Sequence, residues 1–341
     1  MGSAKVDEYL PIRLSGGSGE HEGLIEVFHG RVWGKICANN QWKSESSDVV
    51  CRHLGYDHAF VIYYDDTFSN NMTFVQYDQV DCAGSETNLT SCTSYRYEEG
   101  YCKDSAGEGA GVTCVSSEAP EVRVRLEGGN GSHQGLVEIF VRDDWRKVCS
   151  KGFSFNRGDV VCRSLGYNRA FMVMEDGSMV FSIQNGTAIF IDKLVCTGEE
   201  HDITECRAYR LKERFDSTYG PAAVFCEPGE SLNVRLVGGR GSYEGRVEIS
   251  LNGSWTSICA KEPWIEKTSA QICRVLGFEA GDSVAFYDDN RFGNPEGDFH
   301  IDTLECKDEE PVSITKTCRL RKFQVGYCDG RYASLQCDER K

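Results

Sequence analysis

The sequence lacks the features of several large protein classes. No stretch approaches the roughly 18 consecutive apolar residues of a membrane-spanning helix, so we expect no membrane insertion within these residues. The 37 Lys and Arg are outnumbered by 53 Asp and Glu, which gives a formal net charge of -16. General binding to nucleic acids or anionic membranes needs a cationic surface, so neither is an expected partner of the chain.

Catalytic motifs are also lacking. The seven histidines are scattered, with no HExxH pair and no recognised nucleophile motif. Gly281-Asp282-Ser283 lacks the surrounding sequence of a serine protease site. We therefore do not expect an enzyme.

What the chain does contain is a threefold repeat. The blocks Gly23–Val27, Gly135–Ile139 and Gly245–Ile249 match and lie 112 and 110 residues apart. Solenoid repeats run roughly 20 to 50 residues, so this longer period indicates repeated domains. We place an N-terminal tail at 1–11, the first repeat at 12–114, a linker at 115–121, the second repeat at 122–226, a linker at 227–233, the third repeat at 234–337 and a C-terminal tail at 338–341. The start lacks the apolar stretch of a secretory signal, as expected of a trimmed expression product.

Each repeat is predicted to combine short strands with one helix. In the first repeat, β-rich runs flank His29-Gly30, which predicts a hairpin. Helices are predicted from Ser46 to Gly55, Asp159 to Gly166 and Thr268 to Gly277, led by capping residues and ended by glycine. The predicted fold class is α+β.

The 17 cysteines indicate an oxidising compartment. Six fall in the first repeat, five in the second and six in the third, and the paired CxxC knuckles of zinc sites are absent. An even count in a domain of roughly 100 residues is typical of disulfides, although spacing alone leaves the pairing open. Five N-x-S/T sequons agree with an exported glycoprotein: Asn71, Asn88, Asn130, Asn185 and Asn252.

The spacing of these residues resembles a known family. In the first repeat the pattern runs from Trp33 to Cys37, from Asp48 to Tyr56, and from Asp78 to Glu86 followed by Cys92. It resembles the scavenger receptor cysteine-rich (SRCR) domain, three times over nearly the entire chain. The resemblance implies three tandem small disulfide-rich domains, each a curved antiparallel β-sheet that cradles one short α-helix.

The resemblance also implies disulfides of the group A type. The implied bridges are Cys37–Cys102, Cys51–Cys114 and Cys82–Cys92 in the first repeat, Cys162–Cys226 and Cys196–Cys206 in the second, and Cys259–Cys328, Cys273–Cys337 and Cys306–Cys318 in the third. In the second repeat, Asp216 stands where the other repeats have Cys102 and Cys328, so the family's bridge to Cys149 is lost. A buried thiol is the favoured interpretation of Cys149, because the matching strand position should face inward. An interchain bridge is the alternative.

Charge is distributed unevenly among the repeats. The first carries 7 basic and 15 acidic residues, whereas the second carries 14 of each. Two corresponding segments are basic and are candidate ligand-binding sites: Arg207, Arg210, Lys212 and Arg214 in the second repeat, and Lys316, Arg319, Arg321 and Lys322 in the third. Guanidinium groups can clamp sulfate, phosphate or carboxylate. The alternative is a solvated face with scattered acidic partners such as Glu205 and Glu213.

The resemblance raises calcium as a candidate metal. Many family members hold Ca²⁺ through two Asp after the first cysteine and a Glu before the last, because hard cations prefer clustered carboxylates. The matching candidates in the first repeat are Asn39, Asn40 and Glu108, while Lys151 and Lys261 stand at such positions in the other repeats. We expect no required cofactor, and the case for Ca²⁺ is weak. Acidic pairs also recur after each helix, as polar turns or, alternatively, as Ca²⁺ sites or contacts to a cationic partner: Asp65-Asp66, Glu175-Asp176 and Asp288-Asp289.

These observations predict a non-catalytic extracellular recognition protein, either a receptor ectodomain or a secreted binder. The acidic total favours a protein or peptide ligand. One alternative is scavenger-type binding of polyanions or microbial surfaces through the two basic segments. Another is an accessory region of a larger secreted enzyme, a context in which family members occur.

Overall fold

The computed structural model of the chain describes residues 10–38, 42–65, 67–68, 74–96, 109–116, 122–174, 181, 189–210, 219–227, 233–251, 254–259, 266–278, 284–286, 291–294, 299–307, 314–325 and 331–338. The chain folds into two compact units. Unit one is formed by Met1–Arg125, Glu138–Cys149 and Thr187–Thr218, and unit two by Leu126–Val137, Ser150–Gly186 and Tyr219–Lys341. Unit one therefore contains the whole first repeat with part of the second, and unit two contains the whole third repeat with the remainder of the second.

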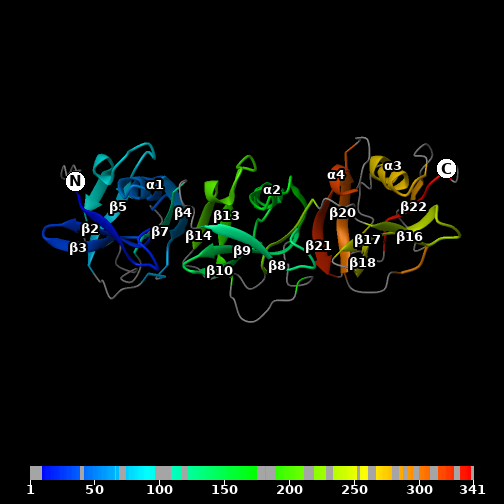
Figure 1. The fold of residues 1–341 in the computed structure, drawn as a ribbon, viewed down its shortest axis with the longest axis horizontal. Coiled ribbons are helices and arrows are strands. Elements are labelled where there is room, and N and C mark those ends of the chain that lie inside the picture. Colours follow the sequence, from blue (N-terminus) through cyan, green and yellow to red (C-terminus); the bar gives the residue numbers. More distant parts are fainter. Residues whose placement is uncertain are drawn as a thin grey trace. The chain divides into compact units, whose positions relative to one another are not determined.

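The first repeat is a curled sheet with one main helix (Figure 1). Its strands are β1 Ile12–Gly16, β2 Glu22–His29, β3 Val32–Ile36, β4 His58–Tyr63, β5 Val75–Asp81, β6 Thr93–Arg96 and β7 Gly111–Val115. Its helix is α1 Ser44–His53, and a single 3-10 turn covers Leu89–Ser91. The strand order is β6-β5-β3-β2-β7-β4, with β1 on β2. The pair β3–β5 is parallel and the other pairs are antiparallel.

The second repeat follows the same plan. Its elements are β8 Arg123–Gly128, β9 Gln134–Val141, β10 Asp144–Val148, α2 Phe155–Ser164, β11 Ala170–Met174, β12 Ile189–Ile191, β13 Lys193–Val195, a 3-10 turn at Ile203–Glu205, β14 Arg207–Arg210 and β15 Ala223–Cys226. In unit one, β10 pairs with β9 and β12, and β13 pairs with β14. In unit two, β15 pairs with β9 and β11.

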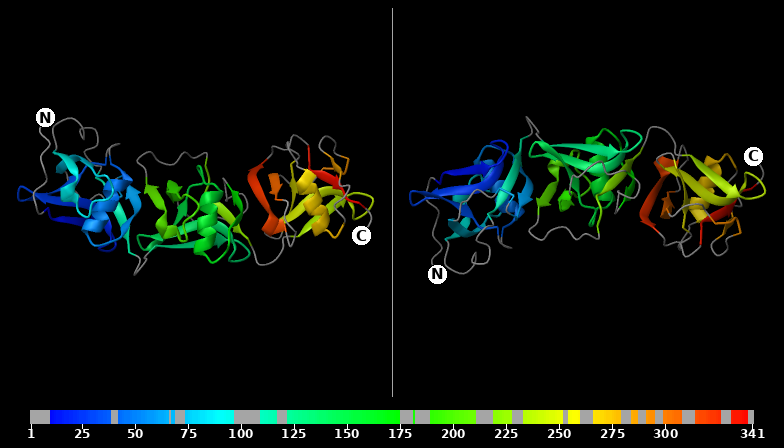
Figure 2. Two further views of the ribbon diagram at one scale, coloured as in Figure 1. Left: turned by 90° about the horizontal axis from the view of Figure 1, so that it is seen from above. Right: turned by 90° about the horizontal axis from the view of Figure 1, so that it is seen from below.

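The third repeat lies wholly in unit two. Its elements are β16 Val234–Gly238, β17 Glu244–Leu251, β18 Ser254–Ile258, α3 Glu266–Val275, β19 Val284–Phe286, β20 Phe299–Cys306, α4 Ile314–Thr317, β21 Cys318–Val325 and β22 Ser334–Gln336. Figure 2 shows the main helix of each repeat against one side of its curled strands. The predicted α+β class is confirmed, with one parallel pair in each repeat where the resemblance implies a wholly antiparallel sheet.

The predicted hairpin at His29-Gly30 joins β2 to β3 and is confirmed. Gly30 and Arg31 both have left-handed φ angles, 60° and 69°, as a two-residue type I′ turn requires. In the second repeat the corresponding turn is Arg142-Asp143, with φ angles of 55° and 54°. Neither residue is glycine, and such strained backbone points to a local role for the side chain.

The three predicted helices are confirmed, and each ends two residues before its glycine. The left-handed φ angles that stop the helices are 92° at Gly55, 85° at Gly166 and 85° at Gly277. Each helix begins two to four residues earlier than predicted, at Ser44, Phe155 and Glu266.

The prediction that Ser46, Ser47 and Asp48 cap the first helix is wrong. Ser46 and Ser47 are buried within α1. The Ser46 hydroxyl donates to the Val80 carbonyl at 2.8 Å, which ties the helix to β5. Asp48 Oδ1 instead accepts the backbone N–H of Ala59 at 3.0 Å, at the start of β4. The polar run therefore anchors the helix to the sheet.

Each unit has its own apolar core. In unit one, Val49 and Val50 of α1 pack against strand residues such as Ile25 and Ile36, and all four are fully buried. In unit two, one cluster contains residues of both repeats, among them Phe171, Met172 and Leu320. Burial of an aliphatic or aromatic side chain contributes roughly 1.5–3 kcal/mol, so these clusters dominate the stability of the units.

The repeated glycine that begins each matching sequence block is a position of close backbone contact. Gly23 has a φ angle of 154°, and a Cβ there would lie 2.5 Å from the Ser15 backbone nitrogen on β1. We expect Gly23→Ala to destabilise the first repeat by about 3 kcal/mol, from strain and the enforced separation of β1 and β2. Hydrogen exchange of the Ile25 amide, which donates to the Ala110 carbonyl, reports on this repeat.

Gly55→Ala is the matched control. Gly55 also has a left-handed φ angle, but a Cβ there would meet no atom within 4 Å. Its expected cost is about 1 kcal/mol, from backbone conformation alone. Equal destabilisation by the two variants would contradict the role given to the contact with β1.

Candidate binding surfaces

The disulfides set the frame on which the surfaces are built. Six of them have both cysteines within the described residues: Cys51–Cys114, Cys82–Cys92, Cys162–Cys226, Cys196–Cys206, Cys273–Cys337 and Cys306–Cys318. Cys37 and Cys259 are also disulfide-bonded, and their predicted partners Cys102 and Cys328 lie outside the described residues. Cys149 is a buried thiol that forms no disulfide. The longer bridge ties α1 to β7 in the first repeat and α2 to β15 in the second, and it ties α3 to the residue directly after β22 in the third.

A glutamate organises the short disulfide loop of the first two repeats. The Glu86 carboxylate accepts the backbone N–H groups of Ala83 and Gly84, each at 2.8 Å. Glu200 does the same for Thr197 and Gly198, at 2.7 and 2.8 Å. Partial burial raises the pKa of each carboxyl. The backbone donors lower it by more than burial raises it, so both pKa values fall below the ordinary glutamate value. The carboxylates therefore shape the loops and remain ionised.

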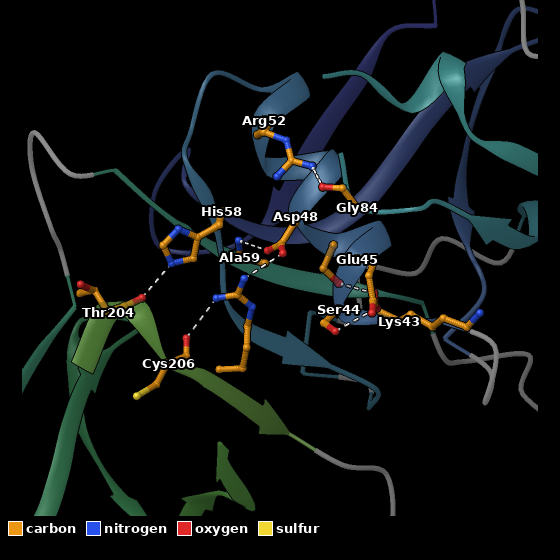
Figure 3. A network of polar contacts seen from close by, with 12 residues as sticks. Lys43, Ser44, Glu45, Asp48, Arg52, His58, Ala59, Gly84, Thr204 and Cys206 are labelled. Atoms are coloured by element: carbon orange, nitrogen blue, oxygen red, sulfur yellow. Dashed lines mark hydrogen bonds and ion pairs between the residues drawn. The ribbon is translucent and has the colours of Figure 1, made fainter. Parts of the chain in front are cut away.

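The basic segment of the second repeat faces carboxylates of the first. Arg207 Nη2 donates to Asp48 Oδ2 at 2.8 Å. Figure 3 shows Asp48 of the first repeat near Thr204 and Cys206 of the second. Arg210 Nε donates to Asp65 Oδ2 at 3.0 Å, and its Nη1 lies 3.2 Å from Asp192 of its own repeat. Both guanidinium groups are thus engaged by carboxylates within unit one. Lys212 and Arg214, the other predicted ligand-binding residues of this segment, lie outside the described residues.

The strained turn of the second repeat takes part in the same contact. Arg142 Nε lies 3.8 Å from the carboxylate of Glu22, whose side chain is fully buried in the first repeat. Its guanidinium also stands 4.8 Å from the centre of the Phe68 ring. A left-handed backbone at Arg142 is therefore accompanied by an ion pair and a cation–π contact.

The basic segment of the third repeat has a corresponding contact in unit two. Arg319 Nη2 donates to Asp159 Oδ2 at 3.0 Å. Lys316 is exposed, and its backbone carbonyl accepts from Arg169. Arg321 and Lys322 belong to β21, but their side chains lie outside the described residues.

Sequence reasoning missed the acidic partners of these arginines. Asp48 and Asp159 occupy the same helix position, three residues before a bridged cysteine, and Arg207 and Arg319 each follow the second cysteine of a short loop. The sequence did contain a signal: the aspartate has the same position in the first and second repeats, and the arginine has the same position in the second and third. A charge count for each repeat conceals this signal because it averages over the surface.

The calcium candidates Asn39, Asn40 and Glu108 lie outside the described residues. In the second repeat, Lys151 stands where the resemblance would place a carboxylate, with Nζ 5.4 Å from the centre of the Tyr219 ring. An ammonium group at that place does not fit a calcium site. Within the described parts of the chain, no cluster of three His, Cys, Asp or Glu side chains could hold a metal ion.

Two of the five sequons can be placed. Asn130 is exposed. Asn88 is half-buried, and its Oδ1 accepts hydrogen bonds from the hydroxyls of Thr90 and Ser91. The remaining sequons lie outside the described residues: Asn71, Asn185 and Asn252.

The described surface also carries exposed apolar side chains. Val32 and Phe74 are 48% and 52% exposed in the first repeat, and a Cβ on Gly34 would lie 2.7 Å from the Phe74 ring, so the ring covers this glycine. Trp255 and Val284 are exposed in the third repeat. No helix in the described part of the chain is long and apolar enough to cross a bilayer.

One main helix, one long bridge and one short bridge recur in all three repeats, and comparison with known proteins agrees with this arrangement. The model of the scavenger receptor cysteine-rich domain matches residues 15–115, 127–227 and 237–338. The chain belongs to the SRCR family. It is therefore built of non-catalytic binding modules that occur in extracellular proteins.

Relatives extend over most of the chain. It is 30% identical over 321 residues to the egg peptide speract receptor of Strongylocentrotus purpuratus. These aligned residues make up 93% of this chain and 59% of that protein. It is 32% identical over 268 residues to an SRCR domain superfamily protein of Patiria pectinifera, which covers 78% of this chain and 22% of that protein. The third SRCR domain of murine neurotrypsin is a similar solved structure, with 32% identity, a TM-score of 0.27, and coverage of 31% of this chain and 96% of that one. The chain thus spans less than two thirds of either relative's length.

Proposed function

We propose that this chain is the extracellular recognition part of a receptor-like protein and engages a protein or peptide ligand through its SRCR surfaces. The observation that carries this proposal is the similarity over 93% of the chain to a protein named as an egg peptide receptor. The net charge of -16 supports a polypeptide ligand over a polyanion. The proposed recognition requires no cofactor.

The ion pairs made by the basic segments also support a polypeptide ligand over a polyanion. A polyanion-binding surface needs cationic groups that are open to the ligand. Arg207, Arg210 and Arg319 instead contact carboxylates of a neighbouring repeat, at 2.8 to 3.0 Å. A polyanion would have to displace these carboxylates, so scavenger-type binding through the same arginines is the weaker proposal.

Heparin chromatography of the full chain tests the choice. We expect elution below physiological salt, because the net charge is -16 and Arg207, Arg210 and Arg319 of the basic segments already contact carboxylates. Arg207→Ala with Arg210→Ala should leave the elution position close to that of a control variant, Lys151→Ala with Lys193→Ala, which removes two exposed cations. Retention well above physiological salt, lost in the arginine variant and kept in the control, would overturn the proposal.

A positive arm uses the immobilised full chain and pools of synthetic peptides. We expect saturable binding of at least one pool. Its affinity should fall far less between 50 and 200 mM salt than the roughly thousandfold loss typical of contacts to many phosphates. Binding that disappears over this salt range would favour the polyanion interpretation.

A further inference from the structure

The same pair of hydrogen bonds to one aspartate occurs at both contacts between successive repeats. In unit one, Asp48 of α1 accepts the Ala59 N–H through Oδ1 (Figure 3) and Arg207 Nη2 through Oδ2. In unit two, Asp159 of α2 accepts the Ala170 N–H through Oδ1 at 2.8 Å and Arg319 Nη2 through Oδ2 at 3.0 Å. In both cases one carboxylate joins its own helix and strand to the arginine of the next repeat.

A strand joins the preceding repeat beside each of these carboxylates. In unit one, β14 pairs in parallel with β4, with Ala208, Tyr209 and Arg210 opposite Val61, Ile62 and Tyr63. The Tyr64 N–H extends the ladder by donating to the Arg210 carbonyl at 2.9 Å. In unit two, β21 pairs in parallel with β11, with Leu320 opposite Met172. The added strand is in each case the one that directly follows the short disulfide loop.

The residue at the start of the accepting strand, or directly before it, reaches back to that loop. His58 Nε2 lies 2.8 Å from the Thr204 carbonyl in unit one. Arg169 occupies the matching position in unit two, directly before β11, and donates to the carbonyl of Lys316, which matches Thr204, and to that of Thr315. Two different side chains at one position thus make contact with the same place in the next repeat.

The aspartate and arginine are well suited to fix this arrangement. Their side chains are 16% and 25% exposed for Asp48 and Arg207, and 16% and 30% for Asp159 and Arg319. Water screens such part-buried pairs less than fully exposed pairs. Each aspartate is already held by a backbone N–H, so little additional side-chain freedom is lost when the arginine binds. Apolar packing adds to the pair, since Tyr64 stacks with Tyr209 in unit one.

The two residues occur only where the described contacts use them. At the position of Asp48 and Asp159, the third repeat has Ala270. At the position of Arg207 and Arg319, the first repeat has Thr93. Within these 341 residues, the aspartate therefore appears in the two repeats whose helix accepts the arginine, and the arginine appears in the two repeats that donate it. A general requirement of the fold would place both residues in all three repeats.

We propose that this aspartate and arginine form a directional lock that docks each SRCR repeat onto the one before it. The accepting surface is the helix aspartate with the adjacent edge of β4 or β11. The partner that fits it is an SRCR repeat with arginine directly after the second cysteine of its short disulfide loop. The lock does not depend on which ligand the chain binds.

Hydrogen exchange in the full chain tests the lock at the Tyr64 amide. Asp48→Asn keeps an oxygen for the Ala59 N–H and removes the charge that holds Arg207. We expect exchange at Tyr64 to become about tenfold faster or more, as for loss of a charge-assisted hydrogen bond. Arg207→Ala should give a similar change, and the double variant should exceed neither single variant by much, because both changes remove one interaction.

Internal controls separate the lock from general unfolding. The Ile25 amide lies in the core of the first repeat and should keep its protection in each variant. Asp81→Asn removes an exposed ion pair with Lys43, at 3.5 Å within the same repeat, and should leave Tyr64 unchanged. If exchange at Ile25 also becomes faster in Asp48→Asn, that variant has destabilised the first repeat itself. The test then rests on Arg207→Ala, because Arg207 belongs to the second repeat.

Two results would overturn the proposal. One is unchanged exchange at Tyr64 in Arg207→Ala. The other is a double variant whose effect equals the product of the two single effects, which would show that the residues act independently. Asp159→Asn extends the test to unit two, where exchange should rise in β11 and β21 and stay constant at Tyr64.

Discussion

Removal of the long disulfide of the second repeat is expected to unfold that repeat while its neighbours stay folded. Cys162 and Cys226 are fully buried and 64 residues apart in sequence. In the chain-entropy model, a loop of this length corresponds to about 4 kcal/mol of stabilisation. The second repeat has no bridge at Cys149, so the variant Cys162→Ala with Cys226→Ala removes one of few crosslinks.

The short bridge of the same repeat provides the comparison. Cys196 and Cys206 are 10 residues apart, which corresponds to about 3 kcal/mol in the same model. The Val137 amide, which donates to the Ala222 carbonyl, reports on the second repeat, and the Ile25 and Val247 amides report on the first and third. We expect faster exchange at Val137 in both variants, with the larger change for the long bridge. A larger change for the short bridge, or simultaneous loss at all three amides, would contradict this account.

The sequence predicts best those features that rest on local backbone chemistry and repeated spacing. Glycine after a helix needs no tertiary information, and Gly55 stops α1 as predicted. The hairpin at Gly30 follows from the turn and its flanking strands in the same way. Helix starts were less predictable, because Ser46 bonds to Val80 of a distant strand and does not cap its own helix.

Pairings of distant side chains could not be predicted from composition. Arg207 and Asp48 are 159 positions apart, and their contact depends on how β14 approaches β4. A basic cluster in a sequence therefore has two physical outcomes, an open anion-binding surface or a set of ion pairs. The aligned positions of Ala270 and Thr93 contain the information that separates them, because each marks a repeat without one half of the pair.

A buried charge network in the third repeat gives the second large expected effect. Glu248 on β17 accepts hydrogen bonds from Arg246 Nη2 at 2.9 Å and Arg235 Nε at 2.8 Å. The Arg246 side chain is only 6% exposed and also donates to the carbonyls of Phe292 and Gly293. Removal of Glu248 would leave the Arg246 guanidinium buried without its counter-charge.

We expect Glu248→Ala to destabilise the third repeat by about 3–5 kcal/mol, the usual result of breaking a buried ion pair from one side. Arg235→Ala is the control in the same network. The Arg235 side chain is 46% exposed, and its loss leaves Glu248 paired with Arg246, so about 1 kcal/mol is expected. Urea dependence of exchange at the Val247 amide measures both.

The same network gives a pH dependence of known sign. Burial raises the pKa of Glu248. Arg246 and Arg235 lower it by more than burial raises it, so the pKa lies below the ordinary glutamate value. The resulting stabilisation is present above the unfolded-state pKa and is lost as pH falls through the lower folded-state pKa. The wild-type third repeat should therefore lose stability from about pH 5 downward, and Glu248→Ala should show a weaker dependence over that range. An equally steep acid dependence in Glu248→Ala would assign the effect to other carboxylates.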